Sequence, residues 1–84
     1  DGRADVYALA GTVYAVTTGR TFFDDIEGAR ERIIAHMTRD PLEEGDRLKT
    51  YPTALVKLMR AAVSKAPRAR PSPLEFGKEF AASL

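Results

Sequence analysis

This 84-residue sequence contains few of the side chains that most often act as nucleophiles or metal ligands. His36 is the single histidine, and the chain contains no cysteine. A lone histidine makes a poor metal site, because structural and catalytic zinc ions are held by three or four protein ligands. We therefore expect His36 to be a surface or boundary residue, and Tyr7 and Tyr14 to be core aromatics rather than nucleophiles. The sequence predicts no catalytic, cofactor-binding or metal-binding residue in this chain.

The charge balance argues against several classes of partner. The chain carries 13 basic and 12 acidic residues, a net charge of +1. Such a balance creates no field that would attract nucleic acid or an anionic membrane surface, and the basic cluster between Lys65 and Arg70 does not change that. The absence of cysteine fits a reducing compartment, so we expect a cytoplasmic location and no membrane contact.

The first predicted element, a helix over about residues 4–18, carries Tyr7 and Tyr14. Asp5 is the one charged side chain in that range, and apolar residues fall on every side of the helix. A helix that is apolar all round is buried on all sides or lies in a membrane, and this one is too short to span a bilayer. We expect it at the centre of a domain, ending at Gly19 in a left-handed cap. Its position at the start of a short chain suggests that the chain is part of something larger.

The second predicted helix spans about residues 25–38. Asp24 or Asp25 is placed to cap its N-terminus, where an acidic side chain suits the helix dipole. Four apolar residues recur at helical spacing and predict one buried face, namely Ile26, Ala29, Ile33 and Met37. Before this helix, the adjacent Phe22 and Phe23 should be tucked under neighbouring structure.

Two further helices are predicted over about residues 52–64 and 72–83, with a polar loop through residues 40–47 before them. The third has an apolar face of Leu55, Val56, Met59, Ala62 and Val63. The fourth starts at Ser72-Pro73-Leu74-Glu75, a capping box with proline in the first turn. Its buried side is marked by Leu74, Phe80 and Leu84. No alternating strand pattern occurs, so the predicted class is all-α with four helices.

Two stretches together resemble a known family. The first begins Asp5-Val6-Tyr7-Ala8-Leu9-Ala10-Gly11 and continues with Tyr14, Thr18-Gly19-Arg20 and Phe23. The second comprises Leu55, Leu58-Met59, Lys65-Ala66-Pro67-Arg68-Ala69-Arg70-Pro71-Ser72 and Glu75-Phe76. In order and spacing they are similar to the C-terminal half of the large lobe of eukaryotic-type Ser/Thr protein kinases, with a bacterial-looking composition. The resemblance covers residues 1–84 and implies that they form part of a kinase domain.

The resemblance implies structural roles for Asp5 and Arg70. In that family the matching aspartate accepts backbone hydrogen bonds from the catalytic loop, and the matching arginine forms a buried ion pair with the glutamate of the Ala-Pro-Glu motif. Without the resemblance, Asp5 would be read as a cap of the first helix and Arg70 as a surface arginine. The family's partners would be the rest of the kinase domain, and a protein substrate or regulator docked on the second helix.

The catalytic motifs of the family do not occur in this sequence. Phosphoryl transfer needs a glycine-rich loop, a strand lysine, a His-Arg-Asp loop and an Asp-Phe-Gly metal ligand. Glu75-Phe76-Gly77 only mimics the last, because it falls inside the fourth helix. ATP and Mg²⁺ are therefore expected for the parent domain and not for this segment. Ala15 and Ala66 depart from the family's usual acidic residues, which favours a divergent kinase or a pseudokinase as an alternative. A stand-alone helical interaction module derived from a kinase lobe is the second alternative.

Overall fold

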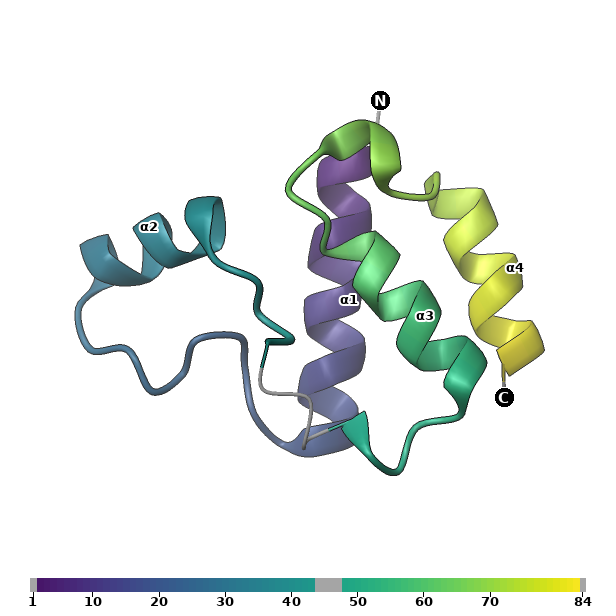
Figure 1. The fold of residues 1–84 in the computed structure, drawn as a ribbon, viewed down its shortest axis with the longest axis horizontal. Helices are drawn as coiled ribbons and strands as arrows, with labels where there is room; N and C mark the ends of the chain where they lie inside the picture. Colours follow the sequence, from purple (N-terminus) through teal and green to yellow (C-terminus); the bar gives the residue numbers. More distant parts are fainter. Residues whose placement is uncertain (1, 44–47, 84) are drawn as a thin grey trace.

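The computed structural model describes residues 2–43 and 48–83, and within them the chain is entirely helical (Figure 1). Its elements in chain order are α1 (Arg3–Thr18), α2 (Ala29–Thr38), α3 (Thr53–Ala62), the short 3-10 helix η2 (Pro67–Ala69) and α4 (Pro73–Ser83). The described residues contain no strand, so the predicted all-α class with four helices is confirmed. The prediction missed η2, and the loop residues 44–47 lie outside the described part.

Three of the helices form one packed unit, and the fourth stands beside it. α3 packs against both α1 and α4, α4 also contacts α1, and η2 lies against α1 (Figure 1). α2 extends away on the other side of α1, joined to it by loops (Figure 1). The molecule is consequently flat, with principal extents of 36, 31 and 17 Å.

The core lies where α1, α3 and the loop after α1 meet. α1 contributes Val6, Ala10 and Tyr14, and α3 contributes Leu55, Leu58, Met59 and Ala62, all buried. Phe22 and Phe23 are only 6% and 8% exposed, as expected for aromatic residues tucked under neighbouring structure. The apolar face predicted for α3 is therefore confirmed, although Val56 is only partly buried.

The C-terminal end of α1 and the start of α4 lie where the sequence predicts them. Gly19 ends α1 in the left-handed region at φ 73°, and its N–H donates to the carbonyl of Ala15 at 2.9 Å. At the start of α4, the N–H of Ser72 donates to Glu75 Oε1 and the N–H of Glu75 donates to Ser72 Oγ, both at 3.2 Å. These reciprocal bonds are the predicted capping box.

The start predicted for α2 is wrong. The helix begins at Ala29 rather than near residue 25, and neither Asp24 nor Asp25 caps it. Gly28 precedes the helix at φ 90° and ψ 127°, a conformation that no helical residue adopts. Asp24 instead pairs with Arg20, whose Nε lies 2.8 Å from its carboxylate.

The predicted inward faces of α2 and α4 also need correction. Ile33 and Met37 are 60% and 72% exposed, and the residue of α2 that is buried is Ala35. In α4, Leu74 is 69% exposed, while Phe76, which the prediction omitted, is buried. Phe80 is partly buried as expected, and Leu84 lies outside the described residues. Both helices thus contact the core through a narrower set of side chains than their apolar spacing indicates.

Candidate functional site

The flank of α1 that faces α2 forms the side of an open groove. α1 is not covered all round within this chain: Leu9 and Val16 are 42% and 80% exposed. The groove has a volume of about 550 Å³ and is lined largely by small or apolar side chains of α1, by the loop after it and by two residues of α2. The lining residues are Tyr7, Ala8, Gly11, Thr12, Ala15, Val16, Thr21, Phe22, Arg32 and His36. Ligand or segment binding sites are commonly concave and apolar in this way.

Tyr7 and His36, which both line the groove, are in contact with each other. The Tyr7 hydroxyl lies 2.8 Å from His36 Nδ1, and the ring of Phe23 meets the His36 ring edge to face at a centroid distance of 5.0 Å. Burial raises the pKa of the Tyr7 hydroxyl, with Arg70 acting against this and Asp40 adding to it. His36 is half-buried, in keeping with a boundary residue, and Tyr7 is a partly buried aromatic rather than a fully buried one.

Two cations flank the Tyr7 ring. Lys65 Nζ lies 5.2 Å and Arg70 Cζ 5.3 Å from the ring centroid, both within the range of cation–π interactions. Lys65 also donates to the backbone carbonyl of His36 at 2.6 Å. Burial lowers the pKa of Lys65, Arg70 lowers it further, and Asp40 acts in the opposite direction. No pattern in the sequence indicates this cluster, because the cluster depends on how the loops place α2 beside α1.

Arg70 is held by backbone oxygens. Its Nε donates to the carbonyl of Ser64 at 2.8 Å and its Nη1 to the carbonyl of Arg3 at 3.2 Å, while Arg3 Nε donates back to the carbonyl of Arg70. The side chain is half-buried, so it is not the surface arginine that its residue type alone suggests. These bonds tie the segment after η2 to the start of α1. They do not test the ion pair that the resemblance implies, which stays a prediction.

Asp5 lies in the first turn of α1 and is exposed. It does not cap the helix, since α1 begins at Arg3 with Gly2 in the cap position and no side-chain cap hydrogen bond. The structure does not bring it together with Arg70 in any hydrogen bond. Its predicted anchoring role requires the catalytic loop of a larger domain and likewise stays a prediction.

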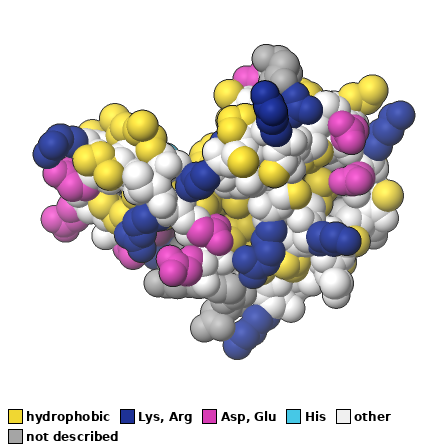
Figure 2. All heavy atoms as spheres, turned by 45° about the horizontal axis from the view of Figure 1, so that its top comes forward, with side chains coloured by type: hydrophobic (Ala, Val, Ile, Leu, Met, Phe, Trp, Pro, Cys, Tyr) yellow, Lys and Arg dark blue, Asp and Glu magenta, His cyan; other side chains and the backbone are white. Residues whose placement is uncertain are grey.

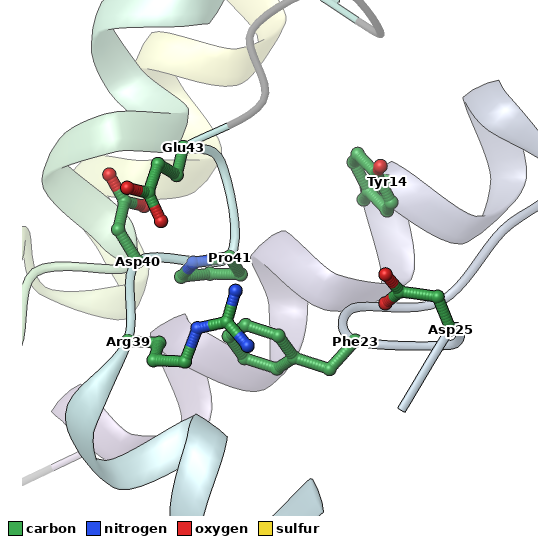
Figure 3. Close-up of a pocket in the computed structure, with 7 residues that line it drawn as sticks. All are labelled: Tyr14, Phe23, Asp25, Arg39, Asp40, Pro41 and Glu43. Carbon is green, nitrogen blue, oxygen red and sulfur yellow. The ribbon is translucent and has the colours of Figure 1, made fainter. Parts of the chain in front are cut away.

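A second, smaller cavity lies between the loop after α1 and the loop after α2 (Figure 3). It has a volume of about 40 Å³, and the guanidinium of Arg39 lies 5.7 Å from the centre of the Phe23 ring beside it. Asp25, Asp40 and Glu43 place carboxylates around its rim (Figure 3). A single water needs roughly 10–15 Å³ of such volume, so this cavity has room for a few waters and is too small for a substrate.

The described part of the chain offers no candidate metal centre. No group of three or more His, Cys, Asp or Glu side chains there is arranged to hold a metal ion. None of the described helices combines the length and apolar character needed to cross a membrane.

Comparisons with known proteins point to one class of enzyme. The chain is 37% identical over 70 residues to the serine/threonine-protein kinase Pkn1 of Myxococcus xanthus, covering 83% of this chain and 10% of that protein. It is 33% identical over 86 residues to the serine/threonine-protein kinase PknJ of Mycobacterium tuberculosis and to PknJ of Mycobacterium bovis, covering all of this chain and 15% of each. The chain thus spans a small part of the length of these relatives. No protein-family model and no solved structure matches it.

Proposed function

We propose that this chain is the helical C-terminal part of the large lobe of a Ser/Thr protein kinase. The observation that carries the proposal is the similarity to PknJ along the whole chain, at 33% identity. The complete protein would transfer the γ-phosphate of ATP to serine or threonine of a protein substrate. ATP and Mg²⁺ would bind residues outside these 84, and the cytoplasm is the compartment that we propose for this reaction.

The open flank of α1 supports this proposal. A helix with apolar residues on every side is stable when it is buried on every side, yet Val16, which lines the groove, is 80% exposed here. Each fully buried aliphatic side chain stabilises a fold by about 1.5–3 kcal/mol relative to its exposed state. We therefore assign the groove between α1 and α2 to the remainder of the kinase domain, which would pack there as the segment's main partner.

Arg70 would pair with a glutamate of the activation segment. Its bonds to the carbonyls of Ser64 and Arg3 use two of the five N–H donors of a guanidinium. The planar fork of the remaining donors matches a carboxylate at two points, which a lysine cannot reproduce. Asp5, exposed in the first turn of α1, would accept backbone N–H groups of the catalytic loop.

The surface of α2 is the part that we assign to protein substrates or regulators. Hydrophobic side chains gather over α2 on the left of the molecule (Figure 2). They include Ile33, Ile34 and Met37, which are 60%, 46% and 72% exposed. Adjacent exposed apolar side chains of this kind mark protein interaction sites more often than scattered single ones do.

The test is phosphate transfer by the full-length protein. We expect radiolabel to move from γ-labelled ATP with Mg²⁺ to serine or threonine of a general protein substrate. Asp5→Ala should lower kcat by about tenfold or more, each tenfold corresponding to about 1.4 kcal/mol of barrier, because the catalytic loop loses its anchor. Glu27→Ala, at an exposed acidic position outside the helices, is the matched control and should retain full activity. A full-length protein that binds no ATP and transfers no phosphate would point to the pseudokinase alternative.

The alternative of a stand-alone helical module is favoured by one observation. Within the described residues, no buried side-chain nitrogen or oxygen lacks a hydrogen-bond partner. The packed unit therefore needs no further segment to satisfy a buried polar side chain. Thermal unfolding of the 84-residue chain, followed by circular dichroism, separates the two. A cooperative melt of a monomer supports the module, whereas a non-cooperative melt or aggregation supports a segment that depends on a larger domain.

A further inference from the structure

His36 is the point at which α2 is fastened to the remainder of the described molecule. Two hydrogen bonds join α2 to α1 and to the segment after α3, and both involve His36: the Tyr7 hydroxyl lies 2.8 Å from Nδ1 of the ring, and the backbone carbonyl accepts from Lys65 at 2.6 Å. Phe23 adds an edge-to-face contact with the His36 ring. We call these three contacts the His36 latch.

The rest of α2 contributes little to its attachment. Ala35 is its buried residue, while Ile33, Ile34 and Met37 face solvent. Figure 1 shows the helix set apart from the packed unit of α1, α3 and α4. The ring of His36, whose charge changes near neutral pH, therefore supplies two of the three latch contacts that hold α2 in the described molecule.

The surroundings of the latch are rich in positive charge. Lys65 approaches from the segment after α3, Arg32 is on α2 itself, and Arg70 lies over the Tyr7 ring. Arg39 lies over the Phe23 ring that contacts His36. Asp40 is the carboxylate that acts on both Tyr7 and Lys65. A proton added to the His36 ring would thus enter a site in which cations outnumber anions.

We propose that the His36 latch is a pH-sensitive fastening, in which neutral His36 holds α2 against α1 and protonation of His36 releases the helix. With its proton on Nε2, the neutral ring offers Nδ1 as an acceptor for the Tyr7 hydroxyl. In the imidazolium both nitrogens carry a proton, so Nδ1 can only donate to the Tyr7 oxygen, and it is the added positive charge, facing Lys65 and Arg32, that disfavours the attached position of α2. This inference concerns the attachment of α2 and does not depend on kinase activity.

The direction of the pH effect follows from linkage. Burial, Lys65 and Arg32 together lower the pKa of His36 below its ordinary value of 6.5. The fastened state therefore binds fewer protons than the released state in the window just below that value. The free energy that favours attachment of α2 to α1 is therefore greatest above pH 6.5. It decreases as the pH falls through the lowered pKa of His36 in the attached state.

Hydrogen–deuterium exchange on the full-length protein tests this. Exchange of the amides in residues 29–38, corrected for intrinsic rates, should rise several-fold relative to residues 53–62 as the pH falls from about 7.5 to 5.5, a range above the ordinary pKa values of carboxyl groups. His36→Gln keeps an acceptor for Tyr7 but does not titrate, so its exchange in α2 should not depend on pH. Tyr7→Phe should show fast exchange in α2 already at the higher pH.

Two results would overturn the proposal. One is a wild-type protein in which corrected exchange of α2 is the same at both pH values. The other is a His36→Gln variant that retains the full pH response, which would assign the effect to another group. Both readouts are independent of phosphate transfer, so failure of the latch and failure of the proposed kinase function are distinguishable.

Discussion

Gly19 and Gly77 illustrate how a single residue type acts in opposite ways. Gly19 ends α1 at φ 73°, where an L side chain is strained, although a Cβ placed there would meet no atom within 4 Å. Gly77 lies inside α4, where a Cβ would also meet nothing within 4 Å. The difference between the two sites is therefore purely one of backbone conformation.

This pair gives the first prediction. Gly19→Ala should lower the free energy of unfolding by about 1–2 kcal/mol, since it forces alanine into the left-handed region. Gly77→Ala should raise the free energy by about 0.5–1 kcal/mol, because alanine loses less backbone entropy in a helix. Urea unfolding of both variants measures the two changes, and equal signs would contradict the cap assigned to Gly19.

The capping box of α4 gives the second prediction, with a pH dependence. Hydrogen bonds from Ser72 lower the pKa of Glu75 below its ordinary value. Their contribution to stability is therefore present above that value and is lost as the pH falls through the lowered pKa. Ser72→Ala should cost about 1 kcal/mol at neutral pH and return the pKa of Glu75 towards normal. Titration of the Glu75 carboxyl by NMR checks the second effect, and an unchanged pKa in Ser72→Ala would count against the capping box.

At the scale of elements, the sequence predicted the presence of the helices better than it predicted which of their faces are buried. Signals carried by neighbouring residues, such as Ser72 with Glu75 or Gly19 after α1, were confirmed. The start of α2 was predicted four residues too early because Asp25 and Ile26 fit a helical pattern, and the φ of 90° at Gly28 is not visible in that pattern. The buried faces of α2 and α4 were predicted wrongly, because the spacing of apolar residues does not show whether another element packs against that face.

Met59 and Met37 test this difference between a buried and an open face. Met59, in α3, is 0% exposed, and Met37, in α2, is 72% exposed. Met59→Ala should destabilise the fold by about 2–5 kcal/mol, because it leaves a cavity in the core. Met37→Ala should change stability by about 0.5 kcal/mol or less. Chemical denaturation measures both, and a similar loss at the two sites would show that α2 is packed more closely than described.

At the scale of the whole molecule, the sequence indicated similarity to Ser/Thr protein kinases but not how the elements of this chain meet. The similarity to Pkn1 and PknJ agrees with the resemblance read from Asp5–Gly11 and Lys65–Ser72. The cluster of Tyr7, His36 and Lys65 could not be foreseen, since its members are about thirty residues apart and their meeting depends on the path of two loops. The anchoring roles proposed for Asp5 and Arg70 depend on the catalytic loop and activation segment of a larger domain, so the structure of these residues does not test them.

The ion pair proposed for Arg70 gives a prediction at this scale. In the full-length protein, Arg70→Leu should destabilise the domain by about 3–5 kcal/mol, the usual cost of leaving a buried charge unpaired. Arg68→Leu, at an exposed position in the neighbouring η2, should change stability by about 0.5 kcal/mol or less. Thermal unfolding of the two variants compares them. If Arg70→Leu is as mild as Arg68→Leu, the arginine has no buried partner in the domain.

The central claim, that α1 is the buried axis of a larger domain, is tested most directly by the accessibility of its open flank. The chain contains no cysteine, so single cysteines can report on chosen positions. Val16 is 80% exposed in this chain, and Lys78 on α4 is exposed as a matched control. The measurement is the rate at which a thiol reagent modifies Val16→Cys and Lys78→Cys in the full-length protein after its other cysteines have been replaced. We expect Val16→Cys to react much more slowly than Lys78→Cys, because the rest of the domain covers it. Equal rates at the two positions would show that this flank of α1 is open in the full-length protein.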